Sequence, residues 1–274
     1  MLVKYRMLST ITSANFIADI VGILDGTITS TAGLSSGADK TNSSFSGTYP
    51  TSQLTKVNAG TYTFSKIHGS DNTYTHYFRL TFSGTTLTTF TVSQGYTSGT
   101  DTLLNSVAQT VSVSTNTYSA SDQFPSGINI VLNSKCVYIS SVTSGISFGL
   151  FDLGTNGITT TYATNMKMAF IKTNNGTFNI PYAYSLSGAG SSGYGSLSGN
   201  LTNLALPTYK SNASNQGVIV ENPVFLSHAN QGYSAYGVYG LFKLGTSVLA
   251  TDVFYNIGSG PRVTSNDYAV LAEG

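Results

Sequence analysis

The sequence predicts an all-β protein: an antiparallel β-sandwich or jelly-roll-like fold with one short amphipathic helix near the N-terminus. The first observation is alternation, because in short segments bounded by Gly, Asn and Ser the apolar residues take every second position, as in half-buried strands. The second is composition. Only 8% of the residues are charged, and the polar positions are filled by Ser, Thr, Asn and Tyr, which suit strands and turns better than helices. The third is that helical periodicity is convincing over residues 13–24 only.

The predicted helix has Ser13 as its N-cap and Gly26 just past its end. Its apolar stripe is expected to cover the sheet of its own subunit, because most amphipathic helices serve their own core. The alternative is that the helix docks on a neighbouring subunit. Asp19 and Asp25 fall on its polar side and are expected to be solvated. The stripe consists of Phe16, Ile17, Ile20, Val21 and Leu24.

Residues 60–92 predict a three-stranded antiparallel meander, the seed of the sandwich. The alternation places Phe78 in the sandwich core and Arg79 on the opposite face. His76 shares the buried face, where a hydrogen-bonded core histidine is expected rather than a catalytic base. The apolar phase then slips at residues 88–89, which predicts a β-bulge or a twisted edge in the third strand.

Further strands are predicted in two blocks. Residues 1–154 form the helix and the first β block, and residues 155–274 form a second β block. The second block either stands by itself or completes the same domain. The further strands are expected at residues 109–113, 128–132, 136–142 and 146–153 in the first block, and at 166–171, 178–184, 218–226, 236–243, 248–255 and 268–271 in the second.

Residues 185–217 interrupt the second block with a stretch rich in Gly, Ser and Asn, which predicts a long loop or arm. A purely solvated linker would have little use for the apolar side chains spaced along it. We therefore expect an assembly arm that orders on a neighbouring subunit. Its candidate anchors are Leu197, Leu201, Leu204 and Leu206.

A second candidate interface is the tyrosine-rich segment at residues 232–240, where Tyr233, Tyr236 and Tyr239 are interleaved with small residues. Tyrosine is enriched at contacts between proteins, so a subunit interface is the favoured interpretation. The alternative is a platform on which a sugar stacks.

The sequence predicts no catalytic, cofactor-binding or metal-binding site. A G-x-G-x-x-G match at residues 188–193 lacks the following helix and βαβ unit that dinucleotide sites need, and the three histidines are not clustered. Cys136 lies in a predicted buried strand and is expected to be a core residue. Asp101 and Asp152 are expected at turns, with side chains bonded to the backbone. We therefore expect a non-enzymatic protein without cofactors.

The charge pattern bears on partners. The net charge is +1 and Lys and Arg are scattered singly, so the sequence shows no footprint for nucleic acid. No run of 18 apolar residues occurs, so no membrane-spanning helix is expected either. A net charge near zero removes the usual protection against association, and we expect contact between copies of the chain.

Several features of the first block occur in an order that is typical of one group of proteins. An amphipathic helix is followed by a Thr-Gly-Thr-like turn, a strand pair ending in a Tyr-x-Tyr-x-x-Leu-like segment, a Gly-Thr-containing turn and a later strand pair. In this order they resemble the structural proteins of tailed-bacteriophage virions, especially those of large myophages. Here these features lie at residues 15–24, 25–30, 73–82, 95–100, and 135–140 with 147–153.

This resemblance implies a non-enzymatic virion component in a tail, baseplate, collar or capsid-decorating position. It implies several copies per particle, with other copies of the chain and other virion proteins as partners. The alternative is a receptor- or carbohydrate-binding module of a tail fibre, whose partner would be a host-surface glycan.

Overall fold

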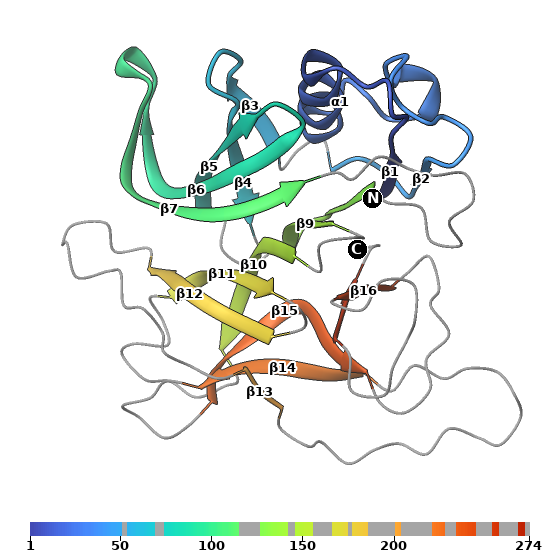
Figure 1. Cartoon of the computed structure of the whole chain (residues 1–274). Helices are drawn as coiled ribbons and strands as arrows, with labels where there is room; N and C mark the ends of the chain where they lie inside the picture. Colours follow the sequence, from blue (N-terminus) through green and yellow to red (C-terminus); the bar gives the residue numbers. More distant parts are fainter. Residues whose placement is uncertain are drawn as a thin grey trace, which may run out of the picture.

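The computed structural model describes most of the first half of the chain and separate strands of the second half. Its described part is predominantly β, with antiparallel pairing throughout and α1 (Ser13–Asp25) as the one α-helix among the described residues (Figure 1). This confirms the predicted fold class. The described residues are 1–50, 54–68, 74–114, 127–141, 146–155, 166–174, 177–185, 201–203, 221–227, 234–244, 254–257 and 268–271.

A five-stranded meander forms one sheet, in which each strand pairs with the next along the chain. The predicted three-stranded seed lies at its centre, and the strand predicted at residues 109–113 is much longer than expected. The strands are β3 (Leu54–Asn58), β4 (Thr63–His68), β5 (Tyr74–Ser83), β6 (Thr86–Thr97) and β7 (Thr102–Ser114).

The predicted bulge is confirmed. Thr81 of β5 pairs with Thr89 of β6, but the next residue, Phe82, pairs with Leu87, so Thr88 is the extra residue. The bulge returns Leu87 to the buried face after the phase slip seen in the sequence. Next to it, Gly84 takes a positive φ of 59° in the tight turn between β5 and β6, a conformation that favours glycine.

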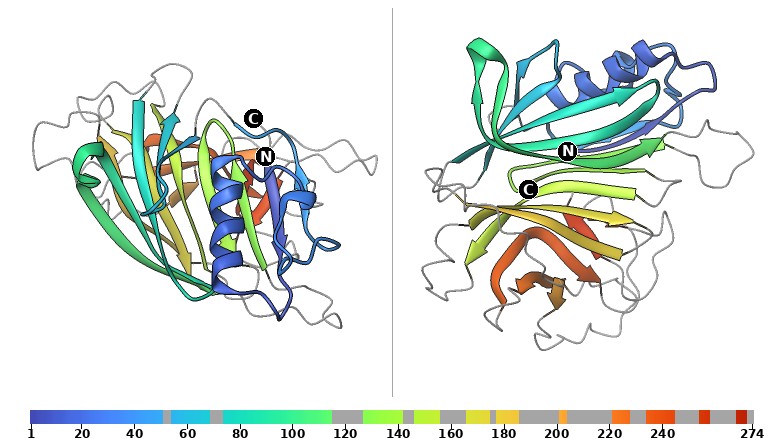
Figure 2. Two further views of the ribbon diagram at one scale, coloured as in Figure 1. Left: turned by 90° about the horizontal axis from the view of Figure 1, so that it is seen from above. Right: turned by 60° about the vertical axis from the view of Figure 1, so that its left-hand side comes forward.

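The larger sheet is built around β8, β9 and β10, which follow one another as antiparallel neighbours (Figure 2). Its main path runs β13-β14-β15-β10-β9-β8-β1-β2, with β11 and β12 branching from β10, and β17 and β16 from β15. Its strands are β1 (Leu2–Arg6), β2 (Ser44–Ser46), β8 (Gly127–Leu132), β9 (Cys136–Ser141), β10 (Ile146–Thr155), β11 (Met166–Asn174), β12 (Thr177–Ser185), β13 (Leu201–Asn203), β14 (Glu221–Ser227), β15 (Ser234–Leu244), β16 (Phe254–Ile257) and β17 (Tyr268–Leu271).

Strand β10 connects the two predicted blocks. It pairs with β9 of the first block and also with β11 and β15 of the second, so the hydrogen bonding continues across the predicted boundary at residue 154. The division into residues 1–154 and 155–274 stays a prediction.

Strand β1 was not predicted. It lies between β8 and β2, and Leu2, Val3 and Tyr5 are all buried, so the segment lacks the alternation of a half-buried strand. Arg6 is also buried, because its guanidinium Nη1 donates to the Tyr5 carbonyl oxygen at 3.0 Å and to Asn129 Oδ1 at 3.1 Å. Because this segment ends in a charged residue and does not alternate, its sequence pattern does not predict a core strand.

A row of aromatic rings joins the two sheets. Phe78 of β5 stacks on Phe64 of β4 and on Phe90 of β6, with ring centroids 5.1 Å apart in both pairs. Phe90 then contacts Phe148 of β10 at 5.0 Å and Phe170 of β11 at 5.6 Å. All five side chains are fully buried, so the core of the sandwich lies between these strands.

Helix α1 packs into the same core, which supports the interpretation that it serves its own subunit. Phe16 meets Phe82 edge to face at 5.9 Å and lies 6.4 Å from the Tyr5 ring. The helix caps differ slightly from the prediction. Thr12, rather than Ser13, is the N-cap, and its hydroxyl accepts from the Asn15 N–H at 3.2 Å.

The C-terminal end of α1 was predicted correctly. Gly26 takes a left-handed conformation, with φ of 77°, just past the last helical residue. The Tyr49 ring lies against this glycine, where a Cβ would meet it at 2.4 Å, and the Tyr49 hydroxyl donates to the Leu24 carbonyl oxygen at 2.7 Å. Glycine is therefore needed here for both its conformation and its size.

The expectation that Asp19 and Asp25 are merely solvated was wrong. Asp19 is 1% exposed and accepts from the Tyr5 hydroxyl at 2.8 Å and from the Ser35 N–H and hydroxyl at 2.8 and 2.7 Å. Burial, together with the nearby Asp19 carboxylate, raises the pKa of Tyr5 well above its ordinary value. The Asp25 carboxylate forms an ion pair with Lys56 of β3. Both carboxylates thus attach the helix to strands.

Short elements of secondary structure lie in the polar stretch after α1 and in the predicted arm. The polar stretch after α1 contains the 3-10 turn η1 (Thr31–Gly33) and strand β2. Within the predicted arm at residues 185–217, Leu201 belongs to β13 and pairs with Leu226 of β14. The expectation of a loop or arm throughout residues 185–217 was therefore wrong at Leu201, because this leucine joins a sheet of its own chain.

The aromatic row leads to a prediction about stability. Replacing Phe78 by Ala should lower the free energy of unfolding by about 3 kcal/mol or more, because the change leaves a cavity between two stacked rings. Thr81→Ala, on the exposed face of the same strand, should change it by less than about 0.5 kcal/mol. Urea unfolding of both variants measures this, and equal losses would contradict the strand phase.

Candidate functional site

The predicted interface residues lie mostly outside the described residues. Tyr236 and Tyr239 are on β15, which pairs with β14 on one side and with β10 and β17 on the other. The hydrogen-bonding edges of β15 are therefore used within its own chain. Any contact that this strand makes with another subunit would have to come from a face of the sheet. Tyr233, Leu197, Leu204 and Leu206 fall outside the described part, and the interface they would form stays a prediction.

Among the described residues, the candidate surface is the outer face of the five-stranded sheet, which is the face opposite the aromatic row. This outer face carries short hydroxyl side chains in cross-strand rows: Thr81, Thr89 and Thr110 form one row across β5, β6 and β7. The next row contains Arg79, Thr91 and Ala108. Apart from Arg79, the described side chains of these two rows are small and uncharged.

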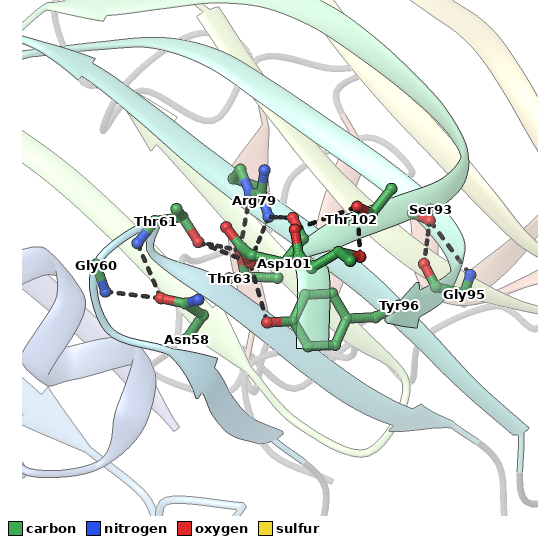
Figure 3. A network of polar contacts seen from close by, with 11 residues as sticks. Asn58, Gly60, Thr61, Thr63, Arg79, Ser93, Gly95, Tyr96, Asp101 and Thr102 are labelled. Atoms are coloured by element: carbon green, nitrogen blue, oxygen red, sulfur yellow. Dashed lines mark hydrogen bonds and ion pairs between the residues drawn. The ribbon is translucent and has the colours of Figure 1, made fainter. Parts of the chain in front are cut away.

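The hairpin tip between β6 and β7 folds back onto this outer face (Figure 3). The tip contains the 3-10 turn η2 (Ser98–Thr100) and then Asp101, which has a left-handed conformation with φ of 50°. Below the tip, the Ser93 hydroxyl donates to the Gly95 carbonyl oxygen at 2.6 Å and bonds to the Leu104 carbonyl oxygen. The bond to Leu104 links β6 to β7 near the tip.

A single carboxylate oxygen fastens the tip to the sheet. Asp101 Oδ1 accepts from Arg79 Nη2 at 2.8 Å, from the Tyr96 hydroxyl at 3.0 Å and from the Thr61 hydroxyl at 3.2 Å (Figure 3). Arg79 also donates to the Asp101 carbonyl oxygen at 3.0 Å and from Nε to Thr63 Oγ1 at 2.8 Å. The network therefore connects β4, β5, β6 and the tip.

A second loop meets the tip at this network. Asn58 Oδ1 accepts from the Gly60 N–H at 2.8 Å and from the Thr61 N–H at 3.2 Å, which shapes the turn between β3 and β4. The next residue, Tyr62, has a φ of 51°, and its ring packs edge to face on Phe82 at 5.5 Å. Left-handed non-glycine residues cost conformational energy, and here one lies in each of the two loops that meet.

One donor and one acceptor of the network, on Arg79 and Asp101, have no hydrogen-bond partner among the described residues. The Arg79 and Asp101 side chains are 24% and 25% exposed. Arg79 Nη1 and Asp101 Oδ2 form no hydrogen bond to any residue that the structure describes, although the rest of each group is fully engaged. A planar donor and an acceptor are therefore fixed in position at the surface.

Two tyrosine rings lie near this polar pair, because Tyr96 donates to Asp101 and Tyr77 is two residues before Arg79 on β5. Tyr77 of β5 and Tyr96 of the hairpin lie with ring centroids 5.6 Å apart and planes inclined by 31°. Both residues are partly exposed. Sequence analysis missed this site because Asp101 was expected to serve only its own turn, whereas it accepts from side chains of the β3–β4 turn, β5 and β6.

A buried polar group lies on the inner side of the same sheet. Lys66 is fully buried, and its amine donates to the Ile67 carbonyl oxygen at 2.8 Å and to the Ser134 carbonyl oxygen at 3.4 Å. Burial lowers the pKa of Lys66 to about 8, and the Asp152 carboxylate only partly offsets this effect. Because Ser134 follows β8, this contact joins the two sheets.

The other titratable residues singled out in the sequence are also in the interior. Burial raises the pKa of the Cys136 thiol to about 12, which fits the expected core residue rather than a nucleophile. His76 is 2% exposed, in line with its predicted place in the core. Asp152 was expected at a turn, but it lies within β10 and is buried, so that prediction was wrong.

The buried amine predicts a pH dependence of stability. Because the pKa of Lys66 is lower in the folded than in the unfolded chain, the folded state binds fewer protons between about pH 8 and pH 10.5, and stability should rise with pH through this window. Relative to Lys66→Met, the wild type should gain about 3 kcal/mol of unfolding free energy. Urea unfolding of both proteins at pH 7 and pH 10 measures the gain, and a constant difference would contradict it.

Within the described ranges, no three or more His, Cys, Asp or Glu side chains are grouped so that they could hold a metal ion. None of the helices in those ranges is long and apolar enough to cross a membrane. Comparisons of the chain with protein-family models, with curated protein sequences and with solved structures give no match.

Proposed function

We propose that this chain is a non-enzymatic structural component of a tailed-bacteriophage virion, which acts by assembling with copies of itself and with other virion proteins. It would occupy a position in the tail, baseplate, collar or capsid decoration. The proposal rests on the order of features in the first block that resembles such proteins, and on the surface chemistry described above.

The outer face of the five-stranded sheet is the observation that carries the assembly part of the proposal. Its two central rows hold Thr and Ala side chains with one charge, and that charge is paired with Asp101. A broad sheet face without free charge has little electrostatic resistance to being covered by another protein. Short hydroxyl side chains also cost little entropy when a contact orders them.

The use of the acidic residues supports a structural rather than a catalytic role. Asp19 attaches α1 to β1 and to Ser35, Asp25 attaches α1 to Lys56, and Asp101 attaches the hairpin tip to the sheet. Burial would raise the pKa of Asp25, but hydrogen bonds from Lys56 and Thr27 outweigh it, and the net pKa is lowered. A carboxylate held ionised in this way favours a permanent ion pair over proton transfer.

Two measurements test the proposal. The native mass of the purified chain, measured by light scattering over a range of concentrations, should correspond to an oligomer. Antibodies raised against the chain should label one defined position on phage particles in electron micrographs. A monomer at all concentrations, together with particles that carry no label, would overturn the proposal.

The predicted arm at residues 185–217 yields a sharper test. Deleting residues 187–200, which precede β13, should leave a folded chain that no longer assembles, because the contacts of Leu197 and of the rest of this segment would be lost. A control with a Gly-Ser segment of the same length in place of these residues separates the loss of contacts from a shortened connection. It should also fail to assemble.

Light scattering and circular dichroism of both variants report assembly and folding. Normal assembly of the deletion variant would contradict the role of the arm in assembly. The interface would then have to lie elsewhere, first in the segment that contains Tyr233, Tyr236 and Tyr239.

A further inference from the structure

The surface beside the folded-back hairpin tip combines two tyrosine rings with the Arg79–Asp101 ion pair. The rings of Tyr77 and Tyr96 lie side by side and are both partly exposed. A tyrosine ring offers an apolar face to C–H groups and a hydroxyl at its edge.

The polar groups next to these rings are fixed in place before any ligand binds. Arg79 is held by Thr63 through Nε and by Asp101 through Nη2, which leaves Nη1 directed away from the network (Figure 3). Asp101 Oδ1 holds three donors, which leaves Oδ2 as an acceptor. A ligand that bonds to Nη1 and Oδ2 would not need to order these side chains, and this lowers the entropic cost of binding.

The charges at this surface define the ligand further. Arg79 and Asp101 neutralise each other at 2.8 Å, and their cross-strand neighbours Thr91 and Ala108 carry no charge. An anionic ligand would be attracted by the guanidinium and repelled by the carboxylate, and a cationic ligand would meet the reverse. A neutral molecule that carries adjacent hydroxyls can donate to the carboxylate and accept from the guanidinium at the same time.

We infer that Tyr77, Tyr96, Arg79 and Asp101 form a binding site for a neutral carbohydrate. A sugar ring presents C–H groups on one face, which suit the tyrosine rings, and paired hydroxyls at its edge, which suit the Arg79 and Asp101 pair. This site does not depend on the proposed place of the chain in a virion. It lies on β5, β6 and the hairpin tip, whereas Tyr236 and Tyr239 lie on β15.

An array of immobilised oligosaccharides tests the inference with the full chain. The probes are neutral oligosaccharides of glucose, galactose, mannose and N-acetylhexosamines, with sialylated and sulfated oligosaccharides as charged comparators. The wild type should bind at least one neutral probe in preference to the charged ones. The dissociation constant of the best neutral probe is then measured in solution by calorimetry.

The variants separate the binding role from a structural one. Tyr77→Ala should weaken binding of that probe about tenfold or more, because the stacking surface is lost. Tyr77→Phe keeps the ring and should retain most of the affinity. Arg79→Met should also weaken binding about tenfold, because the edge donor is lost. Thr81→Ala, on the same face and strand but outside the network, is the matched control and should bind like the wild type.

The inference fails if no neutral probe binds, if only charged probes bind, or if Tyr77→Ala binds as well as the wild type. A thermal unfolding scan accompanies each variant. If Tyr77→Ala were unfolded, the comparison of Tyr77→Phe with Arg79→Met would decide. Retained binding in the first with loss in the second supports the site, and equal binding in both contradicts it.

Discussion

Face-to-face stacking of phenylalanine rings is the interaction on which the rest of this structure depends. Phe64, Phe78 and Phe90 form a row across the inner side of the five-stranded sheet. Phe90 also packs against Phe148 and Phe170 of the larger sheet. Each buried ring removes a large apolar area from water, and the offset stacks add to this. The row therefore fixes which face of each strand is inner, and with it the residues on the outer face.

The aromatic row also determines which side chains lie on the outer face of the five-stranded sheet. Because Phe78 points inward, its neighbours Tyr77 and Arg79 must point outward, where the folded-back tip meets them. The tip is held by one carboxylate, Asp101, in a left-handed conformation. The same network thus explains the bent hairpin and leaves a neutral, partly aromatic surface. That surface fits both proposals, since a protein partner and a saccharide each bind uncharged hydroxyl-rich faces.

Local patterns predicted the strands well where one face is buried. Alternation located β5, and a phase slip located the bulge at Thr88, because both are set by neighbouring residues. Local sequence patterns failed to predict features that depend on contacts between residues far apart in the chain. The fully buried β1 shows no alternation, and Asp19 appears solvated until Tyr5 and Ser35 are brought to it. The site was missed for the same reason, since it assembles side chains from four separate segments.

Hydrogen exchange of the intact chain tests most directly whether the aromatic row joins the two sheets into one cooperative core. Amides in the central parts of β5 and β6 should exchange with the same opening free energy as those of β9 and β10, because neither sheet can open without breaking the row. Phe90→Ala should lower both values together. Exchange of β5 and β6 at a free energy well below that of β9 and β10, with only the first pair affected by Phe90→Ala, would contradict this account.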